Sequence, residues 1–254
     1  APAGERPTIA NQFRHTRESL ATVVELAREG WAIALVHGNG PQVGDSLARN
    51  EIAAPEIEPL PLGVLVAETA GWIGYMIQQS LQNALNRAGL SRTVITVVTQ
   101  TVVSRDDPAL GRPTKFIGHH LTVERKEKLA AHGVAVGKDK GGTWRRLTTS
   151  PIPIGIVEGD AIRRLVEAGT IVVACGGGGL PVYRDPALGW EGLDAVVDKD
   201  RTAAILAQAL DAEILLILTD VEAVYQGFGT ASAVAIPRMT VAAAERMVAA
   251  GQLG

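Results

Sequence analysis

Two segments carry apolar residues at helical spacing. In the segment 66–87 they recur every three or four positions, at Val66, Ala70, Ile73, Ile77, Leu81 and Leu85. This spacing puts them on one face and predicts the longest helix of the chain. A second helix is predicted over 11–28, stopped by Gly30, with its inward positions at Leu20, Val23, Val24 and Ala27.

Four short apolar runs lack the alternation of a strand that has one face in water. They are residues 31–36, 93–98, 171–174 and 214–218, and they are rich in β-branched residues or leucine. Runs of this kind suit strands that are covered on both faces. Helices alternating with buried strands predict an α/β fold with a mostly parallel sheet between helices. The longest runs of about five residues are too short to span a membrane, which needs about 20.

Length and composition favour one folded domain over 1–254. The chain has 254 residues, of which 46% are hydrophobic and 20% charged, the profile of a globular protein. A net charge of −3 and ten aromatic residues (four Trp, three Tyr, three Phe) argue against nucleic acid as a partner. The single Cys175 cannot form an internal disulfide, which favours a reducing, cytoplasmic location. The first residues, APAGER, do not have the pattern of a secretory signal.

Basic residues gather in one part of the chain. Residues 104–147 contain ten basic and five acidic side chains, and the surrounding segment 104–150 has prolines and a Gly-Gly pair that predict an excursion from the sheet. We interpret this excursion either as a solvated loop with incidental charge or as a mobile basic lid over an anionic substrate. It contains five of the six lysines of the chain, namely Lys115, Lys126, Lys128, Lys138 and Lys140.

Two glycine-rich segments follow predicted strands, where ligands bind in parallel α/β sheets. After 31–36 comes HGNGPQVG at residues 37–44, whose glycines let backbone N–H groups approach an anion. After 171–174 comes CGGGGLP at residues 175–181. Four successive glycines are costly in entropy unless the backbone needs positive φ or contacts a ligand closely. Each segment therefore predicts an anion site, with a purely structural turn as the alternative.

Two further segments carry candidate chemistry. The sixth lysine, Lys199, stands between Asp198 and Asp200 ahead of a helical stretch that Asp198 could cap. A lysine there can neutralise charge on a transferring phosphoryl group, while an aspartate holds it or a metal ion; the alternative is a surface salt-bridge cluster. After the run 214–218, Thr219 and Asp220 offer polar groups for a nucleotide.

Other candidates are weaker. Cys175 as a nucleophile needs a neighbouring base, so a small buried residue at a strand end is the preferred interpretation. His119 and His120 are adjacent, and their side chains would point to opposite faces of a strand, so we expect an exposed pair and no metal site. The sequence has neither a Walker A motif nor a dinucleotide fingerprint after a strand.

Taken together and in order, the motifs resemble the carbamate kinases of the amino acid kinase family, over nearly the whole chain. HGNGPQVG and CGGGGLPV separate carbamate kinases from relatives that act on acetylglutamate, aspartate or UMP. The matching segments are HGNGPQVG (37–44), TAGWIGY (69–75), PTKFIG (113–118), WRR (144–146), SP (150–151), CGGGGLPV (175–182), VDKD (197–200) and LTDV (218–221).

The resemblance implies roles for individual residues. Lys199 would stabilise the transferring phosphoryl group, Asp200 would orient Lys199, and Lys115 would reach the anionic substrate from the lid. The substrate and its phosphate would be bound by Gly38, Asn39, Gly40, Gly176, Gly177, Gly178 and Gly179. The nucleotide would lie against Thr219, Asp220, Val221 and Tyr225.

The resemblance also implies a fold, a reaction and an assembly. The fold is a three-layer αβα sandwich with a small protruding lid over 104–150. The reaction is reversible phosphoryl transfer between carbamoyl phosphate with ADP and carbamate with ATP, using Mg²⁺ and no metal ligands from the protein. The assembly is a homodimer, with the helix near Trp72 as one candidate interface. An N-terminal Gly-Gly-Asn loop and a C-terminal segment with a catalytic lysine are expected in the family and are absent from the given sequence, which suggests a longer biological chain.

Two other functions remain open at this point. One is a catalytically silent family member that binds a nucleotide or an acyl phosphate as a regulatory or assembly subunit. The other is a kinase of another small acid.

Overall fold

The structure is a computed structural model that describes residues 8–139, 141–219, 221–230 and 232–252. The chain divides into two compact units, 1–215 and 216–254. The expectation of one domain over 1–254 stays a prediction.

A three-stranded parallel sheet lies at the centre of the first unit. Its middle strand is β8 (Ile171–Val173), flanked by β1 (Ala34–Leu35) and β2 (Val94–Thr96). Both neighbours run parallel to β8, with Ala34 opposite Val172 and Val94 opposite Ile171. These strands lie within three of the four predicted runs and are shorter than predicted.

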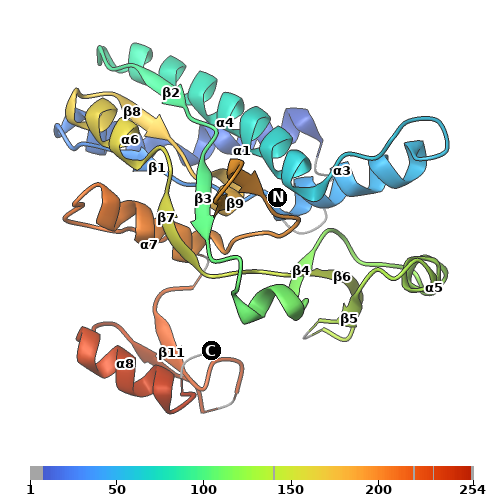
Figure 1. The fold of residues 1–254 in the computed structure, drawn as a ribbon. Helices are drawn as coiled ribbons and strands as arrows, with labels where there is room; N and C mark the ends of the chain where they lie inside the picture. Colours follow the sequence, from blue (N-terminus) through green and yellow to red (C-terminus); the bar gives the residue numbers. More distant parts are fainter. Residues whose placement is uncertain (1–7, 140, 220, 231, 253–254) are drawn as a thin grey trace. The chain divides into compact units, whose positions relative to one another are not determined.

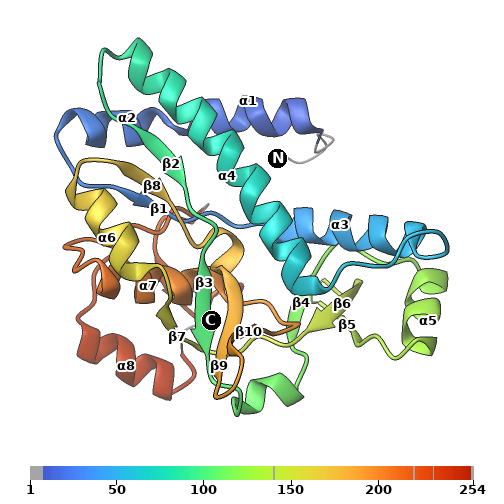
Figure 2. The ribbon, with the colours of Figure 1, turned by 45° about the horizontal axis from the view of Figure 1, so that its top comes forward.

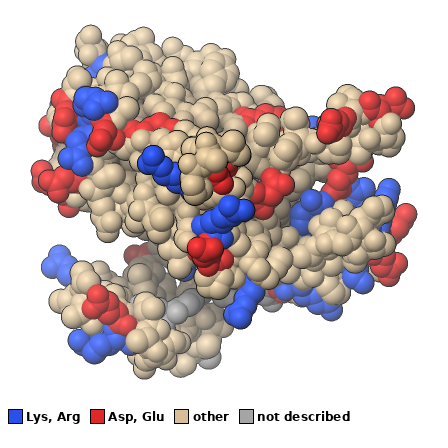
Figure 3. Space-filling model, viewed as in Figure 1, with Lys and Arg blue, Asp and Glu red and all other residues tan. Residues whose placement is uncertain are grey.

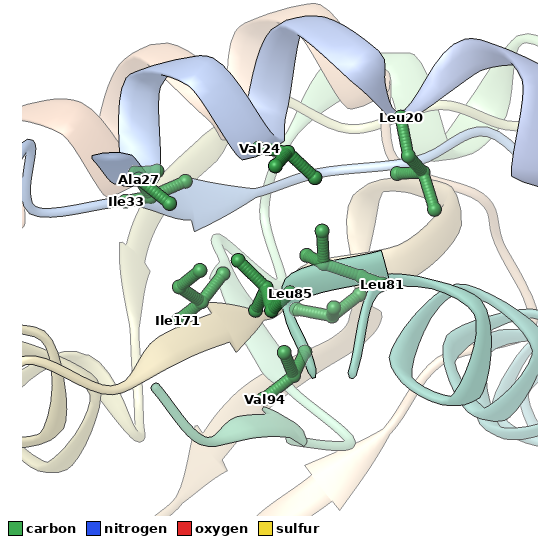
Figure 4. Close-up of a cluster of buried hydrophobic side chains, with 9 residues drawn as sticks. Leu20, Val24, Ala27, Ile33, Leu81, Leu85, Val94 and Ile171 are labelled. Atoms are coloured by element: carbon green, nitrogen blue, oxygen red, sulfur yellow. The ribbon is translucent and has the colours of Figure 1, made fainter. Parts of the chain in front are cut away.

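Successive side chains of β8 point to opposite faces of the central sheet, and each face is covered by helices. Ile171 and Val173 pack in a cluster with helices α2 (Ala21–Arg28) and α4 (Leu62–Arg87), which Figure 4 shows. Val172 packs on the other side with α6 (Gly159–Glu167) and α7 (Lys199–Ala209). Because side chains alternate along a strand, this pattern places helices on both faces of the sheet. The predicted αβα sandwich is confirmed (Figure 2).

The longest helix agrees with the sequence pattern. The predicted helix over 66–87 is α4, which begins four residues earlier at Leu62. Five of the six residues in the apolar stripe are fully buried, and Ile77 is partly buried against the same core. No helix in the described part of the chain is long and apolar enough to cross a bilayer.

The predicted helix over 11–28 is interrupted. It forms two helices, α1 (Ile9–Ser19) and α2, joined at Leu20. Leu20 has ψ −2°, far from the helical value of about −42°, and its side chain is buried in the core. No residue of α1 is buried, whereas Val24 and Ala27 of α2 are. Burial of Leu20 thus coincides with the break between the two helices.

A mixed four-stranded sheet continues from the ends of β2 and β8. Strand β3 pairs parallel with β9 and antiparallel with β7, and β9 pairs antiparallel with β10. The order is β10-β9-β3-β7. The strands are β3 (Gln100–Val103), β7 (Pro153–Ile156), β9 (Leu180–Asp185) and β10 (Gly189–Gly192).

The prediction of a buried strand over 214–218 is wrong. These residues are not in a strand, and all five apolar side chains are 45% to 77% exposed. A strand needs a neighbour for its backbone N–H and C=O groups, and none of the described sheets includes this segment. The boundary between the two compact units also falls inside it.

We call residues 104–150 the lid. Its strands form a separate antiparallel sheet of order β4-β6-β5, away from the central sheet in Figure 1. In Figure 3, Lys and Arg side chains gather over the region of α5 and these strands. The lid consists of a short 3-10 helix (Pro108–Gly111), β4 (Lys115–Ile117), α5 (Val123–Ala131), β5 (Val136–Lys138) and β6 (Trp144–Thr148).

The second unit, 216–254, contains an antiparallel pair of short strands followed by a helix. Val224 lies opposite Ile236 and Gln226 opposite Val234. The elements are β11 (Val224–Gln226), β12 (Val234–Ile236) and α8 (Val241–Ala249).

Candidate active site

Two loops meet at one edge of the central sheet. The segment 37–40 follows β1 and the segment 175–179 follows β8, and these strands are parallel neighbours. The N–H of Gly177 donates to the carbonyl oxygen of His37 at 2.7 Å. A Cβ atom added to Gly177 would lie 2.2 Å from the Asn39 amide. The two glycine-rich segments that the sequence singles out are therefore in direct contact.

Packing explains the run of glycines. Gly177, Gly178 and Gly179 have φ of 68°, 96° and 76°, a region that residues with a Cβ rarely adopt. A Cβ on Gly178 would lie 2.3 Å from the carbonyl oxygen of Val197, and one on Gly179 would lie 2.2 Å from Thr101 Oγ1. The glycines thus allow the loop to fit between the neighbouring backbone and side chains.

Internal hydrogen bonds hold the loop in one conformation. The N–H groups of Gly178 and Gly179 donate to the carbonyl oxygens of Cys175 and Gly176. The carbonyl oxygen of Gly178 accepts from two buried hydroxyls, Thr101 at 2.8 Å and Thr202 at 3.0 Å. These contacts preorganise the loop, and binding of substrate by its glycines stays a prediction.

Asn39 is buried and ties the first loop to α4. Its Nδ2 donates to Thr69 Oγ1 at 3.0 Å, and Thr69 in turn donates to the carbonyl oxygen of Leu65 at 2.8 Å. Helix α3 (Gly40–Ala53) begins directly after Asn39. The neighbouring Gly38 and Gly40 are exposed, so the accessible surface of this loop includes backbone that can approach a ligand closely.

The first turn of α7 places Lys199 beside the first loop. Asp198 caps the helix, as predicted, by accepting from the N–H groups of Asp200 at 3.0 Å and Arg201 at 3.3 Å. Lys199 Nζ donates to Asp200 Oδ1 at 2.7 Å, and both side chains are about half exposed. A Cβ added to Gly38 would lie 3.4 Å from Lys199 Cδ. The contact of Lys199 with Asp200 that the resemblance implies is present.

Asp198 has a second partner that the sequence does not reveal. Lys115 Nζ, from β4 of the lid, lies 2.5 Å from Asp198 Oδ2. Partial burial favours the neutral acid. The hydrogen bond and charge of Lys115, together with the N–H groups of Arg201 and Asp200, outweigh burial and hold the pKa of Asp198 below its usual value. No local sequence signal marks this pair, because its members are 83 residues apart.

Cys175 is fully buried and His37 is half-buried at the base of the two loops. Burial raises the pKa of the Cys175 thiol to about 12, so the thiol form dominates at neutral pH. Its complete burial just after β8 confirms the expectation of a small buried residue at a strand end. Burial lowers the pKa of His37 despite its hydrogen bonds to the backbone of Gly38 and Ala70, which favours a neutral imidazole.

His119 and His120 are exposed, as expected, and each contacts an aspartate. His119 Nε2 lies 2.7 Å from Asp45 Oδ1, and His120 Nε2 lies 3.6 Å from Asp139 Oδ2. In the described ranges, no group of three or more His, Cys, Asp or Glu side chains could hold a metal ion.

Part of the predicted site belongs to the second unit or is not described. Thr219, Val221 and Tyr225 lie in or near β11, in unit 216–254. Their role at the nucleotide therefore stays a prediction. Asp220 and Lys140 lie outside the described residues.

The described site combines two cations with a rigid backbone loop. Lys199 is the first residue of α7 and lies over Gly38, and Lys115 reaches the same turn of the helix from β4. Ammonium groups beside preorganised backbone suit a substrate that carries negative charge. The arrangement can stabilise an anion on which charge develops during a reaction.

Both the sequence and the fold are similar to those of known proteins. A carbamate kinase from Pyrococcus horikoshii is 41% identical over 89% of this chain and 73% of its own length. One from Escherichia coli strain K12 is 44% identical over 93% of this chain and 76% of its own length. The structure of a carbamate kinase from Giardia lamblia bound to AMP-PNP superposes with a TM-score of 0.82 and 32% identity, over 93% of this chain and 75% of the other. The sequence profile of the amino acid kinase family matches residues 8–253, and the chain belongs to that family.

Proposed function

We propose that the protein catalyses reversible phosphoryl transfer between carbamoyl phosphate with ADP and carbamate with ATP. The observation that carries the proposal is the position of Lys199 beside Gly38, with Lys115 of the lid beside Asp198, the residue before Lys199. The relatives named carbamate kinase support this choice of substrates, and the relative bound to AMP-PNP supports a nucleotide as one of them.

In the direction of ATP formation, an oxygen of the ADP β-phosphate attacks the phosphorus of carbamoyl phosphate. The bond between phosphorus and the carbamoyl oxygen breaks, and its electron pair leaves with carbamate. Negative charge is spread over the transferring group in such a transition state. Lys199 neutralises this charge, and Asp200 keeps the Lys199 ammonium in place through the contact at 2.7 Å.

Lys115 binds the anionic substrate from the lid. Before substrate enters, its ammonium is compensated by Asp198 at 2.5 Å. In our proposal the substrate takes over as the partner of Lys115. The preorganised loop of Gly176, Gly177, Gly178 and Gly179 and the exposed backbone at Gly38 and Gly40 supply the surface on which the phosphoryl group moves.

Mg²⁺ enters this proposal as part of the nucleotide substrate. Asp198 and Asp200 each pair with a lysine already, and the described residues offer no cluster of metal ligands. A dedicated magnesium cage does not fit these residues. Magnesium ions bound chiefly by substrate phosphates are common in proteins that use nucleotides.

Further parts of the proposal rest on the family. Thr219, Asp220, Val221 and Tyr225 border the nucleotide, and the protein forms a homodimer. The cytoplasmic location expected from the sequence is kept, because the proposed nucleotides are intracellular metabolites.

The experiment that tests the function measures ATP formed from carbamoyl phosphate and Mg·ADP by luminescence, with the protein as purified and its termini intact. We expect rapid ATP formation that a Lys199→Ala variant loses. A rate no higher than background hydrolysis would contradict the proposal. Nucleotide binding without turnover would then favour a regulatory subunit, and turnover with another small acid would favour a different acceptor.

A further inference from the structure

One glutamate on α3 holds two arginines of the lid. Glu51 lies in the last turn of α3, and its two carboxylate oxygens accept from different partners. Arg125 of α5 donates to Oε2, and Arg146 of β6 donates to Oε1. The side chains are 24%, 33% and 18% exposed for Glu51, Arg125 and Arg146. Partial burial makes these pairs less sensitive to solvent screening than fully exposed ones.

A second attachment lies two turns earlier on the same helix. A Cβ added to Gly44 would lie 2.1 Å from the Cα of Gly118, so α3 and the end of β4 touch through backbone atoms. Next to this contact, His119 Nε2 lies 2.7 Å from Asp45 Oδ1. Gly118 is three residues after Lys115 in the sequence, so this attachment lies close to the lysine that enters the site.

Two attachments along one helix fix an orientation that one attachment cannot. Gly44 and Glu51 are seven residues apart, which is about 10 Å along a helix at about 1.5 Å per residue. The contact at Gly44, together with Ile117 buried against Val43, fixes the base of the lid at the start of α3. The ion pairs at Glu51 attach the more distant α5 and β6 to the end of the same helix. Helix α3 itself begins at the loop that contains Gly38 and Asn39, so one rigid element links the lid to the substrate loop.

We propose that Glu51 is a positioning residue, whose carboxylate seats the lid on α3 so that Lys115 reaches the anionic substrate. This rests on the function proposed above. Glu51 acts through Lys115 and does not touch the substrate itself. The ion pair of Lys115 with Asp198 cannot hold the lid in this orientation by itself, because the substrate takes the place of Asp198 when it binds.

The first test replaces Glu51 with glutamine in the full-length protein. A glutamine offers one acceptor oxygen, and its NH₂ group would face the second guanidinium, so one arginine loses its partner. If the productive lid orientation falls to about a tenth of the population, the KM for carbamoyl phosphate rises about 10-fold. The KM for ADP should change less than about 2-fold, since the lid lysine acts on the other substrate. The matched control is Glu56→Gln, in an exposed turn just after α3.

The second test asks whether Glu51 acts through Lys115. In a Lys115→Ala background the lid lacks the ammonium group that reaches the substrate, so Glu51→Gln should have no further effect on the KM for carbamoyl phosphate. An equal effect of Glu51→Gln in both backgrounds would show general loss of structure and overturn the proposal. A Glu51→Gln variant with the same KM as Glu56→Gln would overturn it as well.

A third measurement does not depend on activity. Hydrogen exchange followed by mass spectrometry should be faster over residues 115–148 in Glu51→Gln than in Glu56→Gln, with the strands β1, β2 and β8 unchanged. If the unmodified protein lacks turnover, the proposed function fails. The exchange measurement still tests whether Glu51 holds the lid against α3. Unchanged exchange over the lid would overturn the role of Glu51 whatever the activity.

Discussion

Lys115 and Asp198 are 83 residues apart in the sequence, and their Nζ and Oδ2 atoms lie 2.5 Å from each other. The next residue after Asp198 is Lys199, which pairs with Asp200 at 2.7 Å. Two lysines are thus balanced by two aspartates around the first turn of α7. An entering anion meets cations whose charge is already compensated, and it must compete with a carboxylate for each.

Lys199 gives the most direct test of the chemistry. Lys199→Ala should lower kcat for ATP formation by about 10²- to 10³-fold, because a preorganised cation at the transferring group is lost. Its side chain is about half exposed, so the thermal unfolding midpoint should change little. Lys128→Ala, on the exposed side of the lid, serves as the control and should retain full turnover. Equal kcat values for the two variants would remove Lys199 from the mechanism.

Asp198 should stabilise the fold near neutral pH and lose this contribution in acid. Its pKa is held below the usual value despite partial burial, by Lys115 and by the N–H groups of Arg201 and Asp200. The unfolded chain therefore binds more protons than the folded one below about pH 4, and the free energy of unfolding should fall as the pH drops through that range. Urea unfolding of Asp198→Asn should show a shallower fall, whereas Asp211→Asn, at an exposed position, should follow the unmodified protein.

His37 should destabilise the fold when it becomes protonated. Burial lowers its pKa below the ordinary value of 6.5. The contribution of the neutral imidazole to the free energy of unfolding is complete above about pH 6.5. It is lost as the pH falls from about 6.5 towards the folded-state pKa of His37. His37→Gln, which keeps a donor for the carbonyl oxygen of Gly38, should reduce this slope in denaturant titrations. The exposed His132→Gln is the control, and a slope unchanged by His37→Gln would contradict the prediction.

The glycine run can be tested by comparing two glycines with similar backbone angles. Gly178 (φ 96°) and Gly169 (φ 86°) both have positive φ, but a Cβ meets Val197 at 2.3 Å only at Gly178 and meets nothing within 4 Å at Gly169. Gly169→Ala should cost about 1–2 kcal/mol in the free energy of unfolding, from backbone strain alone. Gly178→Ala should cost about 3 kcal/mol or more, because steric overlap adds to the strain. Equal losses would show that space is not the reason for glycine at Gly178.

Features with a local period were predictable from the sequence. The stripe from Val66 to Leu85 gives the position of α4 because a helix repeats every 3.6 residues. The glycine segments were found because such residues are costly unless the backbone needs them. Their contact follows from the parallel neighbours β1 and β8, which place both loops at one sheet edge.

Features that depend on distant partners were not predictable. Hydrophobicity over 214–218 suggested a buried strand, but burial depends on a neighbouring strand that the segment does not have among the described residues. Asp198 was recognised as a helix cap from its neighbours, whereas its pairing with Lys115 depends on where the lid folds. Glu51 carried no signal at all, since its partners Arg125 and Arg146 are 74 and 95 residues further along the chain.

The contact between Gly44 and Gly118 has a consequence for changing the protein. Both sides of this contact are main-chain atoms. The contact itself therefore does not depend on which other side chains the lid carries. What a different lid must bring to α3 is a glycine at this point, an apolar residue against Val43, a partner for Asp45 and arginines opposite Glu51. The lid is therefore a part that could be exchanged between relatives while α3 and the loop at Gly38 stay unchanged, which opens a route to grafting new acceptor preferences onto the same phosphoryl-transfer scaffold.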